Sequence, residues 1–124
     1  MTFYSIGKQF SEEPAGRYYS DGKGSGEEFR EEVLVPLIRK LKSGDILEIR
    51  LDEGVESYGS SFLSESFGGL VAHGYFHSEE LLSKLKFSYE DEDFEFYENR
   101  IFQYIKESSF DSKTYVSSKQ NTRK

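Results

Sequence analysis

Residues 46–71 read ILEIRLDEGVESYGSSFLSESFGGLV, and this stretch decides the fold. Its first six residues are mostly aliphatic, a run short enough to predict a central and largely buried strand. An exit loop follows over 52–59, and apolar side chains then recur at helical spacing, which predicts a helix that ends near Gly74. Serines at positions 60 and 61 stand where this helix begins, and we expect one of them to cap it.

A second helix is predicted upstream, over residues 26–42. Ser25 is a favourable N-cap, Glu28 follows it at capping-box spacing, and apolar residues then recur at helical intervals. Pro36 lies inside this run and lacks the backbone N–H of a regular helical turn, so we expect a local distortion there.

The N-terminal residues predict a hairpin. Apolar and polar side chains alternate over 2–10, which is typical of a half-buried strand. Residues 11–16 contain Pro and Gly and predict a turn, after which Arg17–Tyr19 can return as a short second strand.

Downstream of Gly74 the pattern predicts a short helix that opens at Ser78, a strand around Phe87 and a last helix over 93–106. Strands that alternate with helices imply βαβ crossovers. The sequence therefore predicts an α/β fold with a mixed β-sheet of about four strands and flanking helices.

Length and composition fit one domain. The chain has 124 residues, and its 11 Phe and 9 Tyr must supply much of the core because aliphatic residues are few. We expect the folded domain over 1–108. Residues 109–124 are polar and lack an apolar period, which predicts a disordered C-terminal tail.

Charge and residue types exclude several classes of protein. A formal net charge of −7 argues against binding to nucleic acid, and the absence of Cys excludes disulfides and thiolate metal sites. No run approaches a membrane span, and the first residues do not resemble a signal peptide, so we expect a cytoplasmic protein.

The junction before the 60–74 helix is the first candidate site. Backbone N–H groups and the helix dipole converge there, and in open α/β sheets ligands and partners bind at this edge. Two interpretations stay open: Ser60 and Ser61 serve only as a helix cap and an exposed neighbour, or a serine accepts a phosphoryl group or contacts a partner.

The second candidate site is the glycine-rich loop over 21–27, which enters the upstream helix. Its amides can cradle an anion, but its glycine spacing matches neither a Walker loop nor a dinucleotide fingerprint. A flexible turn with a capped helix and a buried ion-pair network are the alternatives. The residues in question are Arg17, Asp21, Lys23, Ser25, Glu27 and Arg30.

Metal and catalytic motifs are weak. His73 and His77 are four residues apart, but Gly74 lies between them, no Glu follows His73, and a structural zinc usually needs four ligands. The acidic run 90–93 lacks the spacing of a calcium loop, and no catalytic constellation stands out. We therefore expect no metal, no cofactor and no enzymatic activity.

Several motifs resemble the bacterial STAS-like domain family of unknown function. They are Gly16–Arg17–Tyr18, Asp21–Gly22, Ser25–Gly26–Glu27, Phe29–Arg30 and the more specific block of residues 60–71, SSFLSESFGGLV. The likeness extends over most of residues 2–105. STAS domains take their name from sulfate transporters and anti-sigma factor antagonists, and the resemblance implies a non-enzymatic module with a mixed sheet and flanking helices.

The resemblance also implies a mode of regulation. In the antagonists, a partner kinase phosphorylates a serine at the start of the helix after the central strand, which turns binding off. By motif this position falls on Ser60 or Ser61, and the implied partner is an ATPase of the histidine-kinase fold. The residues predicted to contact the partner or accept the phosphate are Ser60, Ser61, Tyr58, Phe62 and Glu65.

Two other functions stay open. The first is a domain that binds a small anion or nucleotide through the loop at 21–27. The second is assembly through an exposed sheet edge or an aromatic patch.

Overall fold

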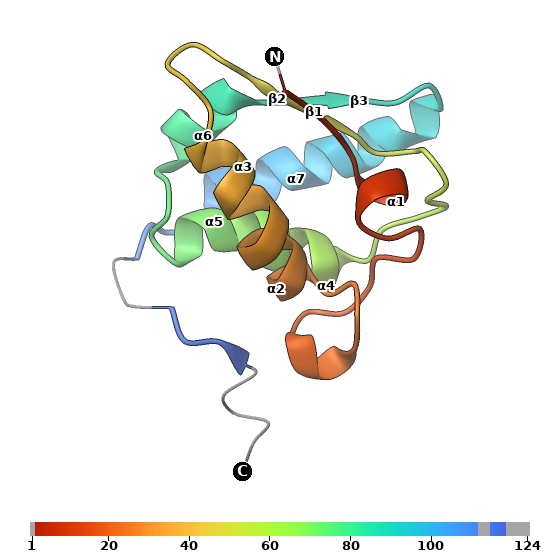
Figure 1. The fold of residues 1–124 in the computed structure, drawn as a ribbon, viewed down its shortest axis with the longest axis horizontal. Coiled ribbons are helices and arrows are strands. Elements are labelled where there is room, and N and C mark those ends of the chain that lie inside the picture. Colours follow the sequence, from red (N-terminus) through yellow and green to blue (C-terminus); the bar gives the residue numbers. More distant parts are fainter. Residues whose placement is uncertain (1, 112–114, 119–124) are drawn as a thin grey trace.

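The computed structural model describes residues 2–111 and 115–118. Its sheet contains three strands, β1 (Thr2–Ser5), β2 (Leu47–Arg50) and β3 (Leu85–Ser88). They lie in the order β1–β2–β3 and both pairs are parallel, with Tyr4 beside Ile49 and Ile49 beside Phe87. Figure 1 shows the sheet at the top of the molecule with the helices below it.

The helices gather on one face of this sheet. The strand order follows the chain in one direction, so two right-handed crossovers place both connecting helical runs on the same side. Leu47 and Ile49 point to that side and have no exposed surface. Phe3 and Lys86 are exposed, which gives the strands their alternation of buried and solvent-facing side chains.

The first crossover joins β1 to β2. It contains α1 (Ile6–Gln9), the 3-10 turn η1 (Tyr19–Asp21), and a helical run of α2 (Gly26–Phe29), the π-helical η2 (Arg30–Leu34) and α3 (Val35–Arg39). The Ser25 hydroxyl accepts a hydrogen bond from the Glu28 N–H at 3.1 Å, so the predicted N-cap is confirmed. The Val35 N–H donates to the Arg30 carbonyl just before Pro36, and this wider π turn is the expected distortion.

The second crossover joins β2 to β3. It contains α4 (Ser60–Leu63), the π-helical η3 (Ser64–Gly68), α5 (Gly69–Ala72) and α6 (Ser78–Lys84). The 3-10 turn η4 (Glu92–Phe94) and the long helix α7 (Glu95–Glu107) follow β3. The helices predicted to begin at the paired serines and at Ser78, and the last helix, are confirmed to within a few residues.

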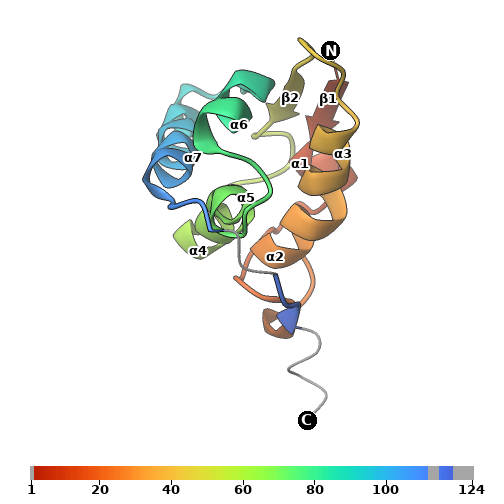
Figure 2. The same ribbon diagram turned by 90° about the vertical axis from the view of Figure 1, so that its left-hand side faces the viewer.

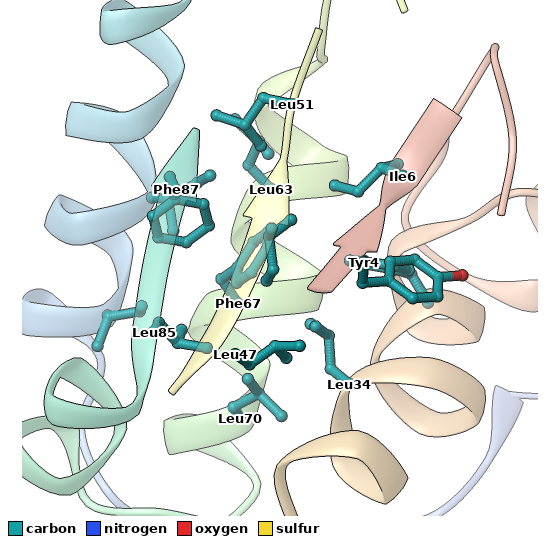
Figure 3. Packing of buried hydrophobic residues seen from close by; sticks show 14 of the residues in the cluster. Tyr4, Ile6, Leu34, Leu47, Leu51, Leu63, Phe67, Leu70, Leu85 and Phe87 are labelled. Carbon is teal, nitrogen blue, oxygen red and sulfur yellow. The ribbon is translucent and has the colours of Figure 1, made fainter. Parts of the chain in front are cut away.

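Aromatic rings supply much of the core, as the composition predicted. Phe29 stacks on Phe62 with ring centroids 5.7 Å apart, and Phe67 meets Phe87 edge-on at 5.5 Å. Figure 3 shows Phe67 and Phe87 close to Leu47 in the layer between sheet and helices. Each fully buried side chain of this size contributes about 1.5–3 kcal/mol to folding.

The two crossovers approach each other closely at Gly26. A Cβ atom at this position would lie 2.7 Å from the carbonyl oxygen of Phe62. Only glycine allows α2 and α4 to come this close. The approach brings the residues that follow Gly26 against those that follow Phe62, and these two segments carry Arg30 and Glu65.

The prediction of a mixed sheet with about four strands needs correction, because the described residues form three strands that are all parallel. The first strand ends at Ser5 rather than at residue 10. The Ser5 hydroxyl accepts from the Lys8 N–H at 3.4 Å and the Gln9 side chain accepts from the Ser5 N–H at 2.8 Å, so the two side chains cap α1.

The predicted return strand at Arg17–Tyr19 is also wrong. The Asp21 carboxylate accepts hydrogen bonds from the N–H groups of Arg17 and Tyr18, at 2.9 and 2.8 Å. These donors are therefore not available to a hairpin ladder, and the chain turns into η1 instead.

The chain after α7 is described in part. Of the predicted tail at 109–124, residues 112–114 and 119–124 lie outside the described residues, whereas Tyr115–Ser118 lie beside the N-terminal part of the α2 run (Figure 2). Within the described ranges, no helix has both the length and the apolar character needed to cross a membrane.

Candidate functional site at the start of α4

Gly59, and not a serine, is the N-cap of α4. Its backbone is extended, with φ −78° and ψ 149°, and no side chain caps the helix. Ser60 and Ser61 are the first two helical residues, and neither hydroxyl hydrogen-bonds to any described residue. The prediction that a serine caps this helix is therefore wrong. Within the described part of the chain both hydroxyls are thus without partners, at the positive end of a helical run that extends to Ala72.

Ser60 borders a cavity of about 300 Å³ that lies between α4 and α7. Phe96 and Arg100 of α7 also line this cavity. The Phe96 ring is 57 % exposed, and the Arg100 guanidinium lies 5.1 Å from its centroid. An exposed aromatic ring, a stacked arginine and a free serine hydroxyl therefore lie together on one surface.

Tyr58 and Phe62, predicted to contact a partner, lie in the core. Their rings stack with centroids 5.9 Å apart, and the Tyr58 hydroxyl donates to the Leu51 carbonyl at 2.6 Å. Burial, with a smaller effect from the Asp52 charge, raises the pKa of Tyr58. These two residues therefore fix the path of the chain from β2 to α4 and hold the serines in place.

Glu65 lies in a buried ion-pair cluster, although the sequence placed it with the partner-binding residues. Its carboxylate accepts from Nη1 of Arg30 at 2.7 Å and lies 3.3 Å from Nη1 of Arg17 and 3.5 Å from Nε2 of His73. Burial acts to raise the pKa of Glu65, but hydrogen bonds and charge from His73, Arg30 and Arg17 lower it to about 2. The group therefore stays ionised at neutral pH.

Arg30 is the centre of this cluster and has no exposed surface. Its Nη1 also donates to the Glu65 carbonyl at 2.7 Å, and its Nε donates to Glu31 at 2.7 Å. Glu31 in turn accepts from the Tyr75 hydroxyl at 2.5 Å. Burial acts to lower the pKa of Arg30, and the two carboxylates more than offset this and raise it.

The structure favours the ion-pair interpretation of the loop residues. Arg17 and Arg30, proposed as anion ligands, both point at the Glu65 carboxylate. Glu27 is buried and accepts from the Tyr19 N–H at 3.0 Å. Each cation is thus already neutralised by a carboxylate of the chain.

Backbone N–H groups of the glycine-rich loop already donate hydrogen bonds to acceptors within the chain. The N–H of Gly24 donates to the Glu28 side chain, that of Gly26 to the Gly16 carbonyl and that of Glu27 to the Arg17 carbonyl. These amides do not form an open cradle for an anion. Of the remaining loop residues, Ser25 is buried as the helix cap, whereas Asp21 and Lys23 are exposed.

The two histidines do not converge on one site. His73 contacts Glu65 at the end of α5, and His77 stacks on Phe110 with centroids 3.8 Å apart. Among the described residues, no three metal-ligating side chains of His, Asp or Glu come together.

Sequence reasoning missed three residues near these sites. Phe96 lies outside the apolar stripe of its helix, and an aromatic residue on the polar side of an amphipathic helix is the signal that could have identified it. Arg100 follows it one helical turn later. Tyr115 and Val116 are flanked by polar residues near the C-terminus, which is a signal of the same kind.

Comparison with known proteins assigns the family. The sequence profile described as "STAS-like domain of unknown function (DUF4325)" matches residues 25–94, more than half of the chain. The match covers Arg30, Glu65 and His73 of the ion-pair cluster and the paired serines, whereas Arg17 precedes the matched residues. No curated protein and no solved structure matches the chain significantly. The resemblance seen in the sequence is confirmed, and the chain belongs to the STAS-like domain family of unknown function.

Proposed function

We propose that this chain is a non-enzymatic regulatory module that docks on a protein partner through the surface of Ser60, Phe96 and Arg100. The observation that carries the proposal is the Ser60 hydroxyl, which has no hydrogen-bond partner among the described residues and borders the same cavity as an exposed aromatic ring and a stacked arginine. Aromatic residues, phenylalanine included, and arginine are enriched at protein interfaces.

The same geometry supports control by phosphorylation. A phosphate on Ser60 or Ser61 would lie at the N-terminus of a helical run, where the helix dipole favours negative charge. On Ser60 the phosphate would also border the cavity that Arg100 lines. The two added negative charges would then change the surface that the partner meets.

The partner class follows from the family resemblance. An ATPase of the histidine-kinase fold would bind the surface and transfer the γ-phosphoryl group of ATP to a serine oxygen. ADP leaves, and the hydroxyl proton passes to solvent or to a base on the partner. The module itself then needs no catalytic residue.

Affinity capture from the native host tests the proposal. We expect the tagged wild-type chain to recover an ATP-binding protein, and Phe96→Ala/Arg100→Ala to recover at least tenfold less. Ser60→Asp/Ser61→Asp should weaken recovery, whereas Ser60→Ala/Ser61→Ala should retain it.

Phe3→Ala is the matched control, because Phe3 is 52 % exposed on the open face of the sheet. Equal recovery by Phe96→Ala/Arg100→Ala and Phe3→Ala would contradict docking at this surface. A third outcome separates the two parts of the proposal. If Phe96→Ala/Arg100→Ala loses the partner but Ser60→Asp/Ser61→Asp recovers it fully, the docking surface is supported and the phosphoserine switch is excluded.

A further inference from the structure

A second cavity, of about 350 Å³, lies on a different part of the molecule and is lined in part by the chain's own C-terminal residues. Glu27, Glu65 and His73 form its charged wall, and Tyr115 and Ser118 line it as well. Figure 2 shows the segment Tyr115–Ser118 beside η1 and the N-terminal part of the α2 run.

Three hydrogen bonds join this segment to one carboxylate. The Tyr115 hydroxyl and the Ser118 hydroxyl both donate to Glu27, and the Ser118 N–H donates to it at 3.0 Å. Burial acts to raise the pKa of Glu27, but these hydrogen bonds and that of Tyr19 outweigh it and lower the pKa. A buried carboxylate thus obtains most of its donors from residues about 90 positions away in the chain.

The Tyr115 ring makes two further contacts with the cluster. The Arg30 guanidinium lies 4.9 Å from the ring centroid, and the His73 ring meets it edge-on at 5.2 Å. Nη2 of Arg30 is buried and has no hydrogen-bond partner among the described residues. The face of an aromatic ring is a favourable neighbour for such a cation.

Two residues that precede this segment in the chain, Ser108 and Phe110, also contact the domain. Phe110 stacks on His77, and the Ser108 hydroxyl donates to the Tyr104 carbonyl at 2.6 Å. The residues from 111 onwards carry four basic side chains and one acidic one, whereas the chain as a whole has a net charge of −7. The net charge of these C-terminal residues is thus opposite in sign to that of the whole chain.

We propose that this cavity, a groove lined by Glu27 and His73 with Arg30 against the Tyr115 ring, is a binding site for a peptide with a tyrosine followed three residues later by a serine. Residues Tyr115–Ser118 occupy it as a tethered ligand of the same chain. The tyrosine supplies a ring for Arg30 and a hydroxyl for Glu27, and the serine supplies a hydroxyl and an N–H. A partner peptide of this chemistry binds only by displacing the segment.

A peptide titration tests the proposal in the full-length chain. Tyr115→Ala/Ser118→Ala empties the groove without changing a core residue. The synthetic peptide DSKTYVSSKQNTRK, which repeats residues 111–124, is then added to the ¹⁵N-labelled variant. We expect saturable shifts at the amides of Glu27 and His73. A control peptide has Phe in place of the tyrosine and Ala in place of the third residue after it. Its affinity should be lower by a factor of about ten or more.

The wild-type chain provides the competition. A tethered ligand acts at an effective concentration in the millimolar range, so the same peptide should bind the wild type at least tenfold more weakly than the emptied variant. No binding to the emptied variant, equal binding of the control peptide, or equal affinity for the wild type would each overturn the proposal.

A spin label distinguishes the chain's own segment from that of a second copy. The sequence has no Cys, and Val116 borders the cavity but is 60 % exposed, so Val116→Cys accepts the label and keeps the hydrogen bonds of Tyr115 and Ser118 to Glu27. We expect broadening at Glu27 and His73 within the labelled chain and none from Lys86→Cys on the sheet face. Broadening only in mixtures of labelled and ¹⁵N-labelled copies would contradict occupancy by the same chain.

Discussion

Arg30 donates from a single nitrogen, Nη1, to both the carboxylate and the backbone carbonyl of Glu65, each at 2.7 Å. The two residues lie in the π-helical segments η2 and η3, one in each crossover. Gly69 leaves room for this arrangement, because a Cβ atom there would lie 2.4 Å from the same nitrogen. The bond therefore ties the two crossovers together inside the layer that carries α4.

Glu65→Gln should lower the stability strongly. The substitution leaves the fully buried Arg30 with one of its two carboxylate partners, Glu31, and the loss of one partner of a buried ion pair costs about 3–5 kcal/mol. Urea denaturation measures the free energy of unfolding. Glu90→Gln is the control, because Glu90 is exposed and pairs with Arg50 at 3.5 Å, which is worth at most about 1 kcal/mol. Equal losses for the two variants would contradict the assigned role of Glu65.

Stability should fall in acid because of the same carboxylate. The pKa of Glu65 is about 2 in the folded chain and 4.5 in its ordinary state, so the unfolded chain binds the proton more readily. The contribution is fully present above pH 4.5 and is lost as the pH falls toward 2. Unfolding free energies between pH 7 and 2 should show this loss, and Glu65→Gln should flatten it. An unchanged slope in the variant would assign the acid sensitivity to other groups.

Gly26→Ala should destabilise the chain, although alanine is ordinarily the better helix former. The new methyl group would lie 2.7 Å from the Phe62 carbonyl, so α2 and α4 would have to move apart. Overpacking of this kind costs about 1–3 kcal/mol. Thermal unfolding measures the effect, and a variant as stable as the wild type would show that the helices do not cross this closely.

Gly59→Ser should have the opposite effect. Gly59 is the N-cap of α4 and has an extended backbone, and a Cβ atom at this position would meet no described atom within 4 Å. A serine there can accept a hydrogen bond from the first turn, which is worth a few tenths of a kcal/mol over glycine. A small rise in the unfolding temperature is expected, and a fall would contradict the assignment of the cap.

The order of helices after residue 25 was predictable because the local sequence signals there agree with the way these segments pack in the fold. Ser25 caps its helix, and the stretch from Leu47 to Val71 forms the buried strand and helix that its apolar pattern indicates. The predicted N-terminal hairpin is wrong because the Gln9 and Asp21 side chains bind backbone N–H groups that a ladder would use. An alternating pattern cannot show this competition.

The candidate site was predictable in position but not in composition. The strand-to-helix junction indicates the paired serines, yet Phe96 and Arg100 come from a helix about 35 residues later and meet Ser60 only in the folded chain. Likewise, the sequence favours a surface role for Glu65 because no local pattern reveals Arg30 as its partner. Contacts of this range depend on how the two crossovers pack.

Photo-crosslinking from position 96 tests the central claim, that this surface docks a protein partner, most directly. Benzoylphenylalanine is placed at Phe96 in one chain and at Phe3 in another, since both rings are exposed and lie on different elements. Irradiation in the native host should give one crosslinked product from position 96 that contains an ATP-binding protein, and none from position 3. The same products from both positions, or none from position 96, would contradict the account.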